Sequence, residues 1–225
     1  MTPSGKPSVG RPQATTHAAI EAAAFTLFDQ QGFDSTSVED IARAVGVGRR
    51  TLFRYFPSKN DIPWGQFDES LHRLRDTLDA IPTSVPVLDA VHRGILEFNM
   101  LDPSAIEQHR RRMRLILTTP ALQAHSVLRY EQWRRVIAEY AASRYAMDPE
   151  SLLPRTIGHI SLALSLAAYE QWLREPGSEL TDLLSRTAPL LRAYVDDATA
   201  GLPPEPRVHR PKPTRTRGTS GASDS

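Results

Sequence analysis

The residues best suited to a chemical task are basic and hydroxyl side chains between positions 36 and 59. Arginine forks match the paired acceptors of guanine, and lysine, threonine and tyrosine commonly bind phosphate oxygens. We expect Arg49, Arg50 and Thr51 to meet base edges and Arg54 to share their outer surface. Phosphates would be held by Tyr55, Lys59 and Thr36. The chemistry predicted here is non-covalent recognition of double-stranded DNA.

Two short helices must position these side chains. Thr36 is suited to cap the first, with Glu39 three residues later completing a capping box. Gly46 follows the last apolar residue of that helix, where a left-handed cap favours glycine. A second helix at 49–56 then presents arginines at its start. This pattern is typical of a helix-turn-helix DNA reader, although plain helical bundles also contain such hairpins.

The stretch from Ala22 to Ile62 resembles the N-terminal head of the TetR family of transcriptional regulators. The segments that carry the resemblance are Gly10–Pro12, Gly32-Phe33, Thr51–Phe56 and Ser58-Lys59. The family often has Tyr at the position of Phe53 and His at that of Tyr55, so the set of phosphates contacted stays open. The resemblance implies a homodimeric repressor that a small molecule releases from its operator. The alternative is that the protein activates transcription.

The composition argues against several classes of protein. The 225 residues contain no Cys, which excludes disulfides and Cys-ligated zinc. The seven histidines are scattered, and no P-loop, GxGxxG, GxSxG or HExxH motif occurs. We therefore expect no metal, no cofactor and no enzyme, with a helical enzyme as the weaker alternative. No signal peptide or membrane span is predicted, so we expect a cytoplasmic protein.

Charge is distributed unevenly along the chain. Residues 1–60 carry seven Lys and Arg against five Asp and Glu, residues 61–200 carry 15 against 19, and residues 201–225 carry five against two. A basic head on an acidic body favours phosphate attraction by the head alone, and disfavours the alternative of a nonspecific nucleoid-type DNA-binding protein.

The chain divides by composition into four segments. We expect a flexible basic arm at 1–13, a DNA-binding domain at 14–62, a ligand-binding and dimerisation domain at 63–200, and a disordered tail at 201–225. Whether the arm and tail touch DNA stays open. No alternating apolar and polar pattern appears, so the predicted class is all-α. A connecting helix at 58–79, bent or interrupted near Pro63 and Gly65, precedes helices at 87–101, 104–118, 121–146, 151–174 and 178–198.

The resemblance implies an effector pocket among the middle helices. Candidate lining residues, each also compatible with ordinary core packing, are Trp64, Phe67, His92, Ile95, Phe98, Met113, Leu117, Trp133 and Tyr169. Nearby, four arginines occupy five positions: Arg110, Arg111, Arg112 and Arg114. They form either a solvated face paired with Glu107 or a cationic mouth for a phosphorylated ligand. Such a mouth on an apolar pocket would suit a fatty acyl-CoA, an effector class that recurs in this family.

The last two helices carry apolar stripes that predict a dimer. The residues that we expect at the interface are Ile157, Ile160, Leu164, Ala168, Leu184 and Leu191. A helix that is apolar over much of its circumference needs partners on more than one side. The resemblance implies a four-helix bundle across a two-fold axis, with an intrachain core as the alternative. Such symmetry suits operator half-sites roughly 34–36 Å apart.

Overall fold

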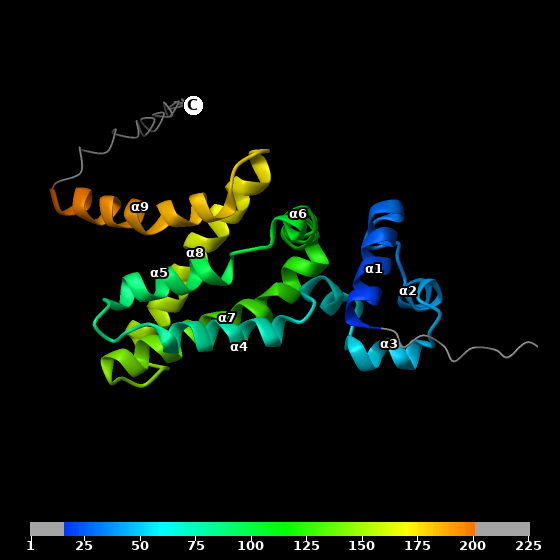
Figure 1. Ribbon diagram of the computed structural model, residues 1–225, viewed down its shortest axis with the longest axis horizontal. Coiled ribbons are helices and arrows are strands. Elements are labelled where there is room, and N and C mark those ends of the chain that lie inside the picture. Colours follow the sequence, from blue (N-terminus) through cyan, green and yellow to red (C-terminus); the bar gives the residue numbers. More distant parts are fainter. Residues whose placement is uncertain (1–15, 201–225) are drawn as a thin grey trace, which may run out of the picture. The chain divides into compact units, whose positions relative to one another are not determined.

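The computed structural model describes residues 16–200, which are helical throughout their regular elements (Figure 1). The arm at 1–13 and the tail at 201–225 lie outside the described residues. The elements are α1 (His17–Gln31), α2 (Val38–Ala44), α3 (Arg49–Tyr55), η1 (Lys59–Trp64), α4 (Phe67–Ala80), α5 (Val87–Phe98), η2 (Pro103–Ala105), α6 (Ile106–Thr118), α7 (Pro120–Tyr145), α8 (Leu152–Arg174) and α9 (Leu180–Ala200). The all-α class is confirmed. Of the described residues, those up to Pro189 form one compact unit and those from Leu190 form another.

Helix α2 is capped one residue later than the sequence predicts. Ser37 accepts a hydrogen bond from the backbone N–H of Asp40, and the Asp40 carboxylate accepts one from the backbone N–H of Ser37. This reciprocal pair is a capping box, so the prediction of Thr36 and Glu39 in these roles is wrong. Both candidate pairs have the same spacing. Thr36 is unavailable because its hydroxyl donates to the Gly32 carbonyl at 2.8 Å.

The turn between α2 and α3 depends on glycine. Gly46 has φ +68°, a left-handed conformation that residues with a Cβ rarely adopt. Gly48 then caps α3, whose inner side places Leu52 in the core of the head, followed by the buried Phe56. The apolar core beneath α1, α2 and α3 also includes Leu122 of α7. The helix-turn-helix predicted from the cap, turn and arginine pattern is therefore present.

The connection from head to body is interrupted, as the glycine and proline near its start predict. The 3₁₀ helix η1 ends at Gly65, which has φ +57°, and α4 starts only at Phe67. A Cβ at Gly65 would lie 2.6 Å from Arg112 Nη1 and 2.9 Å from Glu21 Oε1. Glycine is thus required here by backbone conformation and by the closeness of α1 and α6.

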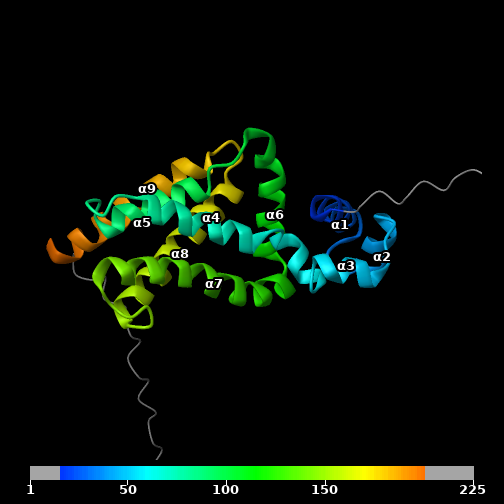
Figure 2. The ribbon, with the colours of Figure 1, turned by 60° about the horizontal axis from the view of Figure 1, so that its bottom comes forward.

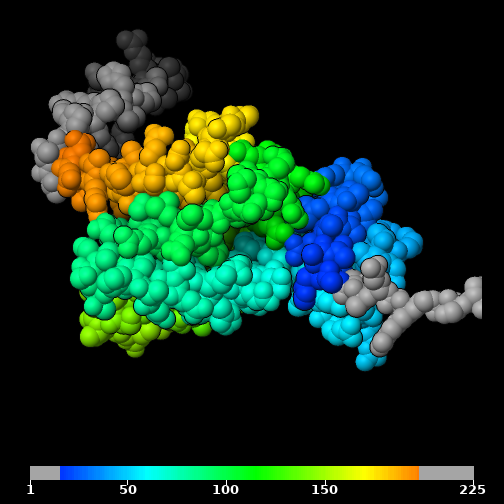
Figure 3. Space-filling view, viewed as in Figure 1, coloured from blue at the N-terminus to red at the C-terminus, as the bar shows by residue number. Residues whose placement is uncertain are grey.

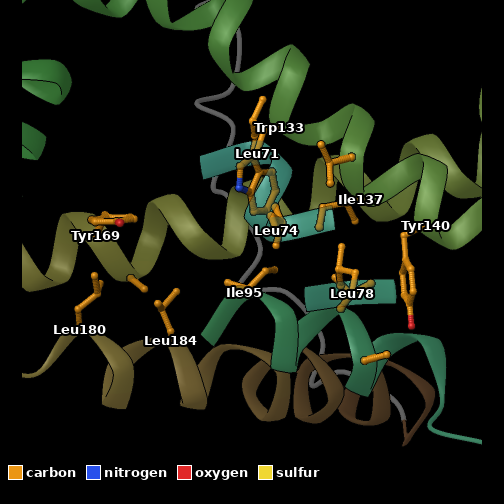
Figure 4. Packing of buried hydrophobic residues seen from close by; sticks show 14 of the residues in the cluster. Leu71, Leu74, Leu78, Ile95, Trp133, Ile137, Tyr140, Tyr169, Leu180 and Leu184 are labelled. Atoms are coloured by element: carbon orange, nitrogen blue, oxygen red, sulfur yellow. The ribbon is translucent and has the colours of Figure 1, made fainter. Parts of the chain in front are cut away.

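The body packs α4, α5, α7 and α8 side by side, while α6 runs across them (Figure 2). Leu71, Leu74 and Leu78 of α4 pack in one core with Trp133 and Ile137 of α7 (Figure 4). Helices α7 and α8 approach closely at Gly158, where a Cβ would meet the Arg134 carbonyl at 2.8 Å. Within the described part of the chain, no helix is both long and apolar enough to cross a membrane.

Candidate DNA-binding surface and effector cavity

The outer side of α3 presents a row of cationic side chains. Arg49, Arg50 and Arg54 are exposed, and Thr51 is half-buried. Arg49 forms an ion pair of 2.8 Å with Glu39 of α2, but both side chains are at least half exposed. A pair this exposed contributes little to stability and exchanges readily with another anion. The geometry therefore agrees with base and phosphate contacts by these arginines, which remain a prediction.

Two residues that the sequence assigns to phosphate contacts have structural roles. Thr36 is 1% exposed, so the prediction that its side chain holds a phosphate is wrong. Lys59 Nζ donates to the carbonyls of Phe33 and Thr36 at 2.8 and 2.9 Å and lies 4.3 Å from the centre of the Phe33 ring. Burial lowers the pKa of Lys59. Its two bonds tie η1 to the loop before α2 and leave one N–H for the predicted phosphate contact.

Tyr55 connects the outer and inner sides of α3. Its ring is half-buried against the core of the head and meets the His17 ring edge-on, with 4.9 Å between centroids. Arg54 lies 5.5 Å from the centre of the Tyr55 ring. The phosphate contact of Tyr55 stays a prediction, and a substitution there would also disturb the packing of α3 on α1.

A cavity of about 300 Å³ lies in the body, bordered by α4 and α6. Figure 3 shows the surface of this region, with α4 in cyan and α6 in green. The predicted lining residues found here are Trp64, Phe67, Phe98, Met113, Trp133 and Tyr169. His92, Ile95 and Leu117 do not line this cavity, so the structure gives no support to their assignment to a pocket. Ile95 is a core residue, and Leu117 packs against the same core from α6.

A chain of polar side chains in the cavity wall escaped sequence analysis. Tyr169 donates to the Asn99 side-chain oxygen, and the Asn99 amide donates to the Ile95 carbonyl at 2.8 Å. His109 Nε2 lies 2.9 Å from the Tyr169 oxygen, whose proton is already donated, so Nε2 must carry its own proton. Burial and nearby Arg112 lower the pKa of His109 to about 4. His109 is therefore neutral at pH 7.

Trp64 brings an unused hydrogen-bond donor to the same cavity. It is 8% exposed, and its indole N–H has no hydrogen-bond partner among the described residues. Buried donors in folded proteins nearly always have an acceptor, and leaving one without an acceptor costs about 1–3 kcal/mol. A ligand with an acceptor group would relieve this cost.

The four clustered arginines of α6 divide between different partners and do not form one cationic mouth. Arg110 covers the Trp172 ring and donates to the Trp172 carbonyl, whereas Arg111 pairs with Asp29 of α1. Arg112 pairs with Glu21 of α1 and is the member of the cluster that lines the cavity. Arg114 is exposed. Successive helical residues are about 100° apart, which separates them around the axis. The alternative pairing with Glu107 is also absent from the ion pairs of this cluster.

Asp61 joins η1 to α7. Its carboxylate accepts hydrogen bonds from Ser58 at 2.7 Å, from Arg129 at 2.7 Å and from His125 at 2.9 Å. Burial opposes ionisation of Asp61, but these hydrogen bonds outweigh burial and lower its pKa. Asp61 lies two residues after Lys59, so one short segment is tied both to the loop before α2 and to the body.

The predicted dimer residues separate into two groups. Ala168 and Leu184 are buried in the core of the chain itself, so their assignment to an interface is wrong. Ile160 is 40% exposed, and Ile157 and Leu164 are half-buried on the same helix. Leu153, Ile157, Ile160 and Leu164 follow one another at spacings of four, three and four, which is typical of helix pairing. Leu153 and Ile160 are exposed, whereas Ile157 also packs against the core of the chain. Leu191 is half-buried in the second unit.

Within residues 16–200, no group of three or more His, Asp or Glu side chains is placed to hold a metal ion.

Residues 20–62 match the family described as bacterial regulatory proteins, tetR family, and residues 85–196 match the MftR C-terminal domain.

Two known regulators are similar to this chain over most of their own length. It is 44% identical to a Mycobacterium tuberculosis protein named as a mycofactocin biosynthesis transcriptional regulator, MftR, over 84% of this chain and 95% of that protein. The segment Phe53–Asp68 predicts a resemblance to this regulator, and the match confirms it. The chain is also 28% identical to the HTH-type transcriptional regulator TcmR of Streptomyces glaucescens, over 81% of this chain and 84% of that protein.

A solved structure supports the fold. Thermus thermophilus FadR, a TetR-family repressor solved with lauroyl-CoA, has a TM-score of 0.52 and 20% identity, covering 85% of this chain and 99% of that chain. At this identity the likeness shows the fold alone.

Proposed function

Since this chain belongs to the TetR family of transcriptional regulators, we propose that it is a sequence-specific repressor released from its operator by a small molecule. Members of this family bind operator DNA and small-molecule effectors, act as dimers and are not enzymes. The observation that carries the proposal is one compact unit that holds both an arginine-tipped α3 and a cavity of about 300 Å³.

DNA recognition is assigned to α3. A helix that enters the major groove presents its N-terminal residues to base edges, and Arg49, Arg50 and Thr51 occupy that end. An arginine fork on guanine discriminates against other bases by roughly 1–3 kcal/mol. Arg54, Tyr55 and the remaining N–H of Lys59 are assigned to phosphates. Operator release follows if the effector prefers a conformation in which the two heads of a dimer no longer match the half-site spacing.

The proposed effector is an amphipathic molecule, with a fatty acyl-CoA as the first candidate. The cavity is at the small end of known ligand pockets, and its apolar lining includes Phe67, Phe98 and Met113. These side chains suit an acyl chain. Thermus thermophilus FadR, which shares the fold, was solved with lauroyl-CoA. That fact selects the first compound to test.

Fluorescence anisotropy tests the proposal directly. Labelled DNA from upstream of the protein's own gene is titrated with protein, with scrambled DNA as competitor and with or without lauroyl-CoA. We expect tight, selective binding that the acyl-CoA reverses. Selective binding without reversal would reject this effector. Equal, weak binding to both DNAs would favour the nonspecific alternative.

Two arginine variants show whether α3 reads the bases. Arg50→Ala should weaken binding to the selected DNA by roughly 1–3 kcal/mol and reduce the preference over scrambled DNA. Arg174→Ala is the matched control, because Arg174 is an exposed arginine of α8 that pairs with Glu170. The assignment of Arg50 is wrong if both variants keep the parent's preference for the selected DNA.

A further inference from the structure

We propose that Arg112 recognises an anionic group of the effector, and that this group displaces Glu21 from Arg112 and frees α1 from the body. The inference rests on the proposed function and names the chemistry by which its cavity acts on the DNA-binding head. The ligand class is an apolar chain that ends in an anionic group.

Arg112 is the point at which the cavity and the head meet. Its guanidinium pairs with the carboxylate of Glu21, which belongs to α1, the first helix of the head. The two side chains are only 20% and 11% exposed. The same arginine lines the cavity. A molecule in the cavity therefore reaches a charge that already holds α1 in place.

The Arg112–Glu21 ion pair is tightly packed by its neighbours. Gly65 packs so tightly against this pair that a Cβ there would lie 2.6 Å from Arg112 Nη1. Its chain neighbour Trp64 supplies the unpartnered indole N–H of the cavity wall. An oxygen anion bound at Arg112 would compete with Glu21 for the guanidinium, and an acceptor elsewhere on the same ligand would satisfy the Trp64 donor.

The charges of the cavity select an anion. Its lining residues include Arg73 and Arg112 but neither Asp nor Glu, and His109 beside Arg112 is neutral at pH 7. The rest of the wall is largely aromatic and aliphatic. A carboxylate on a long alkyl chain meets these requirements, and so does an acyl-CoA, which offers phosphate oxygens. The shared chemistry is an anionic oxygen joined to an apolar chain.

Displacement would transmit ligand binding to the head. Once the guanidinium pairs with the ligand, the Glu21 carboxylate is left buried without a cation, which is strongly unfavourable. Moving α1 outward restores its contact with water. The neighbouring pair of Arg111 and Asp29 is more exposed and so offers less resistance. Glu21 thus opposes ligand binding, because the ligand must displace it from Arg112. Its unpaired carboxylate then favours the outward movement of α1.

Three ligands and four variants test this exchange. Dodecanoate, lauroyl-CoA and neutral methyl dodecanoate are titrated against the full chain while tryptophan fluorescence is followed, since Trp64 and Trp133 line the cavity. Operator release is followed by anisotropy. The parent should bind at least one anionic ligand about tenfold or more tightly than the ester. Which of the two anions binds shows whether carboxylate or phosphate is read.

Each variant has a distinct expected result. Arg112→Gln should abolish the preference for the anion over the ester. Glu21→Gln should bind the anion more tightly yet release DNA less, because no carboxylate is left unpaired. Arg111→Gln is the matched control, because it removes another arginine between α6 and α1 that does not line the cavity, and it should keep the parent's preference. The double variant Glu21→Gln/Arg112→Gln leaves no unpaired charge, and circular dichroism checks its fold. It should lose the preference for the anion.

The outcomes separate this inference from the proposed function. If none of the three ligands releases the parent from DNA, the proposed response to acyl effectors fails, and the exchange fails with it. If ligands release the parent but Arg112→Gln keeps the preference for the anion, or Glu21→Gln releases DNA as readily as the parent, the exchange is wrong while the repressor stands.

Discussion

At the scale of single residues, buried ionisable side chains make the stability of this protein depend on pH. His109 is neutral in the folded chain, because burial and Arg112 lower its pKa from an ordinary 6.5 to about 4. Between these values the unfolded chain binds a proton that the folded chain does not, so lowering the pH favours unfolding. Asp61 acts in the same direction at lower pH, since its pKa is also lowered.

The contribution of His109 is measurable. Between pH 7 and pH 5 we expect the parent to lose about 2 kcal/mol of unfolding free energy from this residue. His109→Gln removes the titration, so its stability should fall less over the same interval, whatever its stability at pH 7. Urea unfolding of both proteins at the two pH values gives the difference. Equal losses in the two proteins would mean that folding does not lower the pKa of His109.

Single residues also show where sequence reasoning ends. Thr36 and Ser37 each have an acidic residue three positions later, so spacing alone could not choose the cap. The choice depends on the bond from the Thr36 hydroxyl to the Gly32 carbonyl, which exists only after folding. Glu21 and Arg112 are 91 positions apart, and only the packing of α1 against α6 brings them together.

At the scale of elements, η1 holds the head and the body together. Lys59 at its start reaches back to the loop before α2, and Asp61 in its middle binds two side chains of α7. Pro63 and Gly65 predict the interruption that separates η1 from α4. They do not predict the contacts of Asp61, because His125 and Arg129 are more than 60 positions away.

Removing the carboxylate of Asp61 should therefore destabilise the joint between head and body. Asp61→Asn leaves Arg129, which is 16% exposed, without its close anion, and we expect a loss of about 3 kcal/mol in unfolding free energy. Asp68→Asn is the matched control on the same arginine. Asp68 is 71% exposed and 3.6 Å away, so its loss should cost less than about 1 kcal/mol. Urea unfolding at pH 7 ranks the two, and equal effects would contradict the role of Asp61.

At the scale of the whole molecule, DNA reading of the proposed kind requires two copies of the chain. The apolar stripes of α8 and α9 predict pairing, but a stripe cannot show which of its residues the chain keeps for its own core. Ala168 and Leu184 are buried in that core, whereas Leu153 and Ile160 of α8 are exposed. The folded positions of the neighbouring helices decide this division.

A charge placed on the exposed stripe of α8 tests the pairing. Ile160→Glu would bury a carboxylate against an apolar partner, so the dimer should dissociate at least about tenfold more readily, an effect of about 1.4 kcal/mol or more. Leu128→Glu on α7 is the matched control, because Leu128 is also an exposed apolar residue, at 67%, outside the stripe. Analytical ultracentrifugation measures both dissociation constants. The dimer of Ile160→Glu should weaken alone, and its affinity for operator DNA should fall with it, because a palindromic site needs both heads at once. An unchanged dissociation constant for Ile160→Glu would mean that this part of α8 does not lie in the dimer interface.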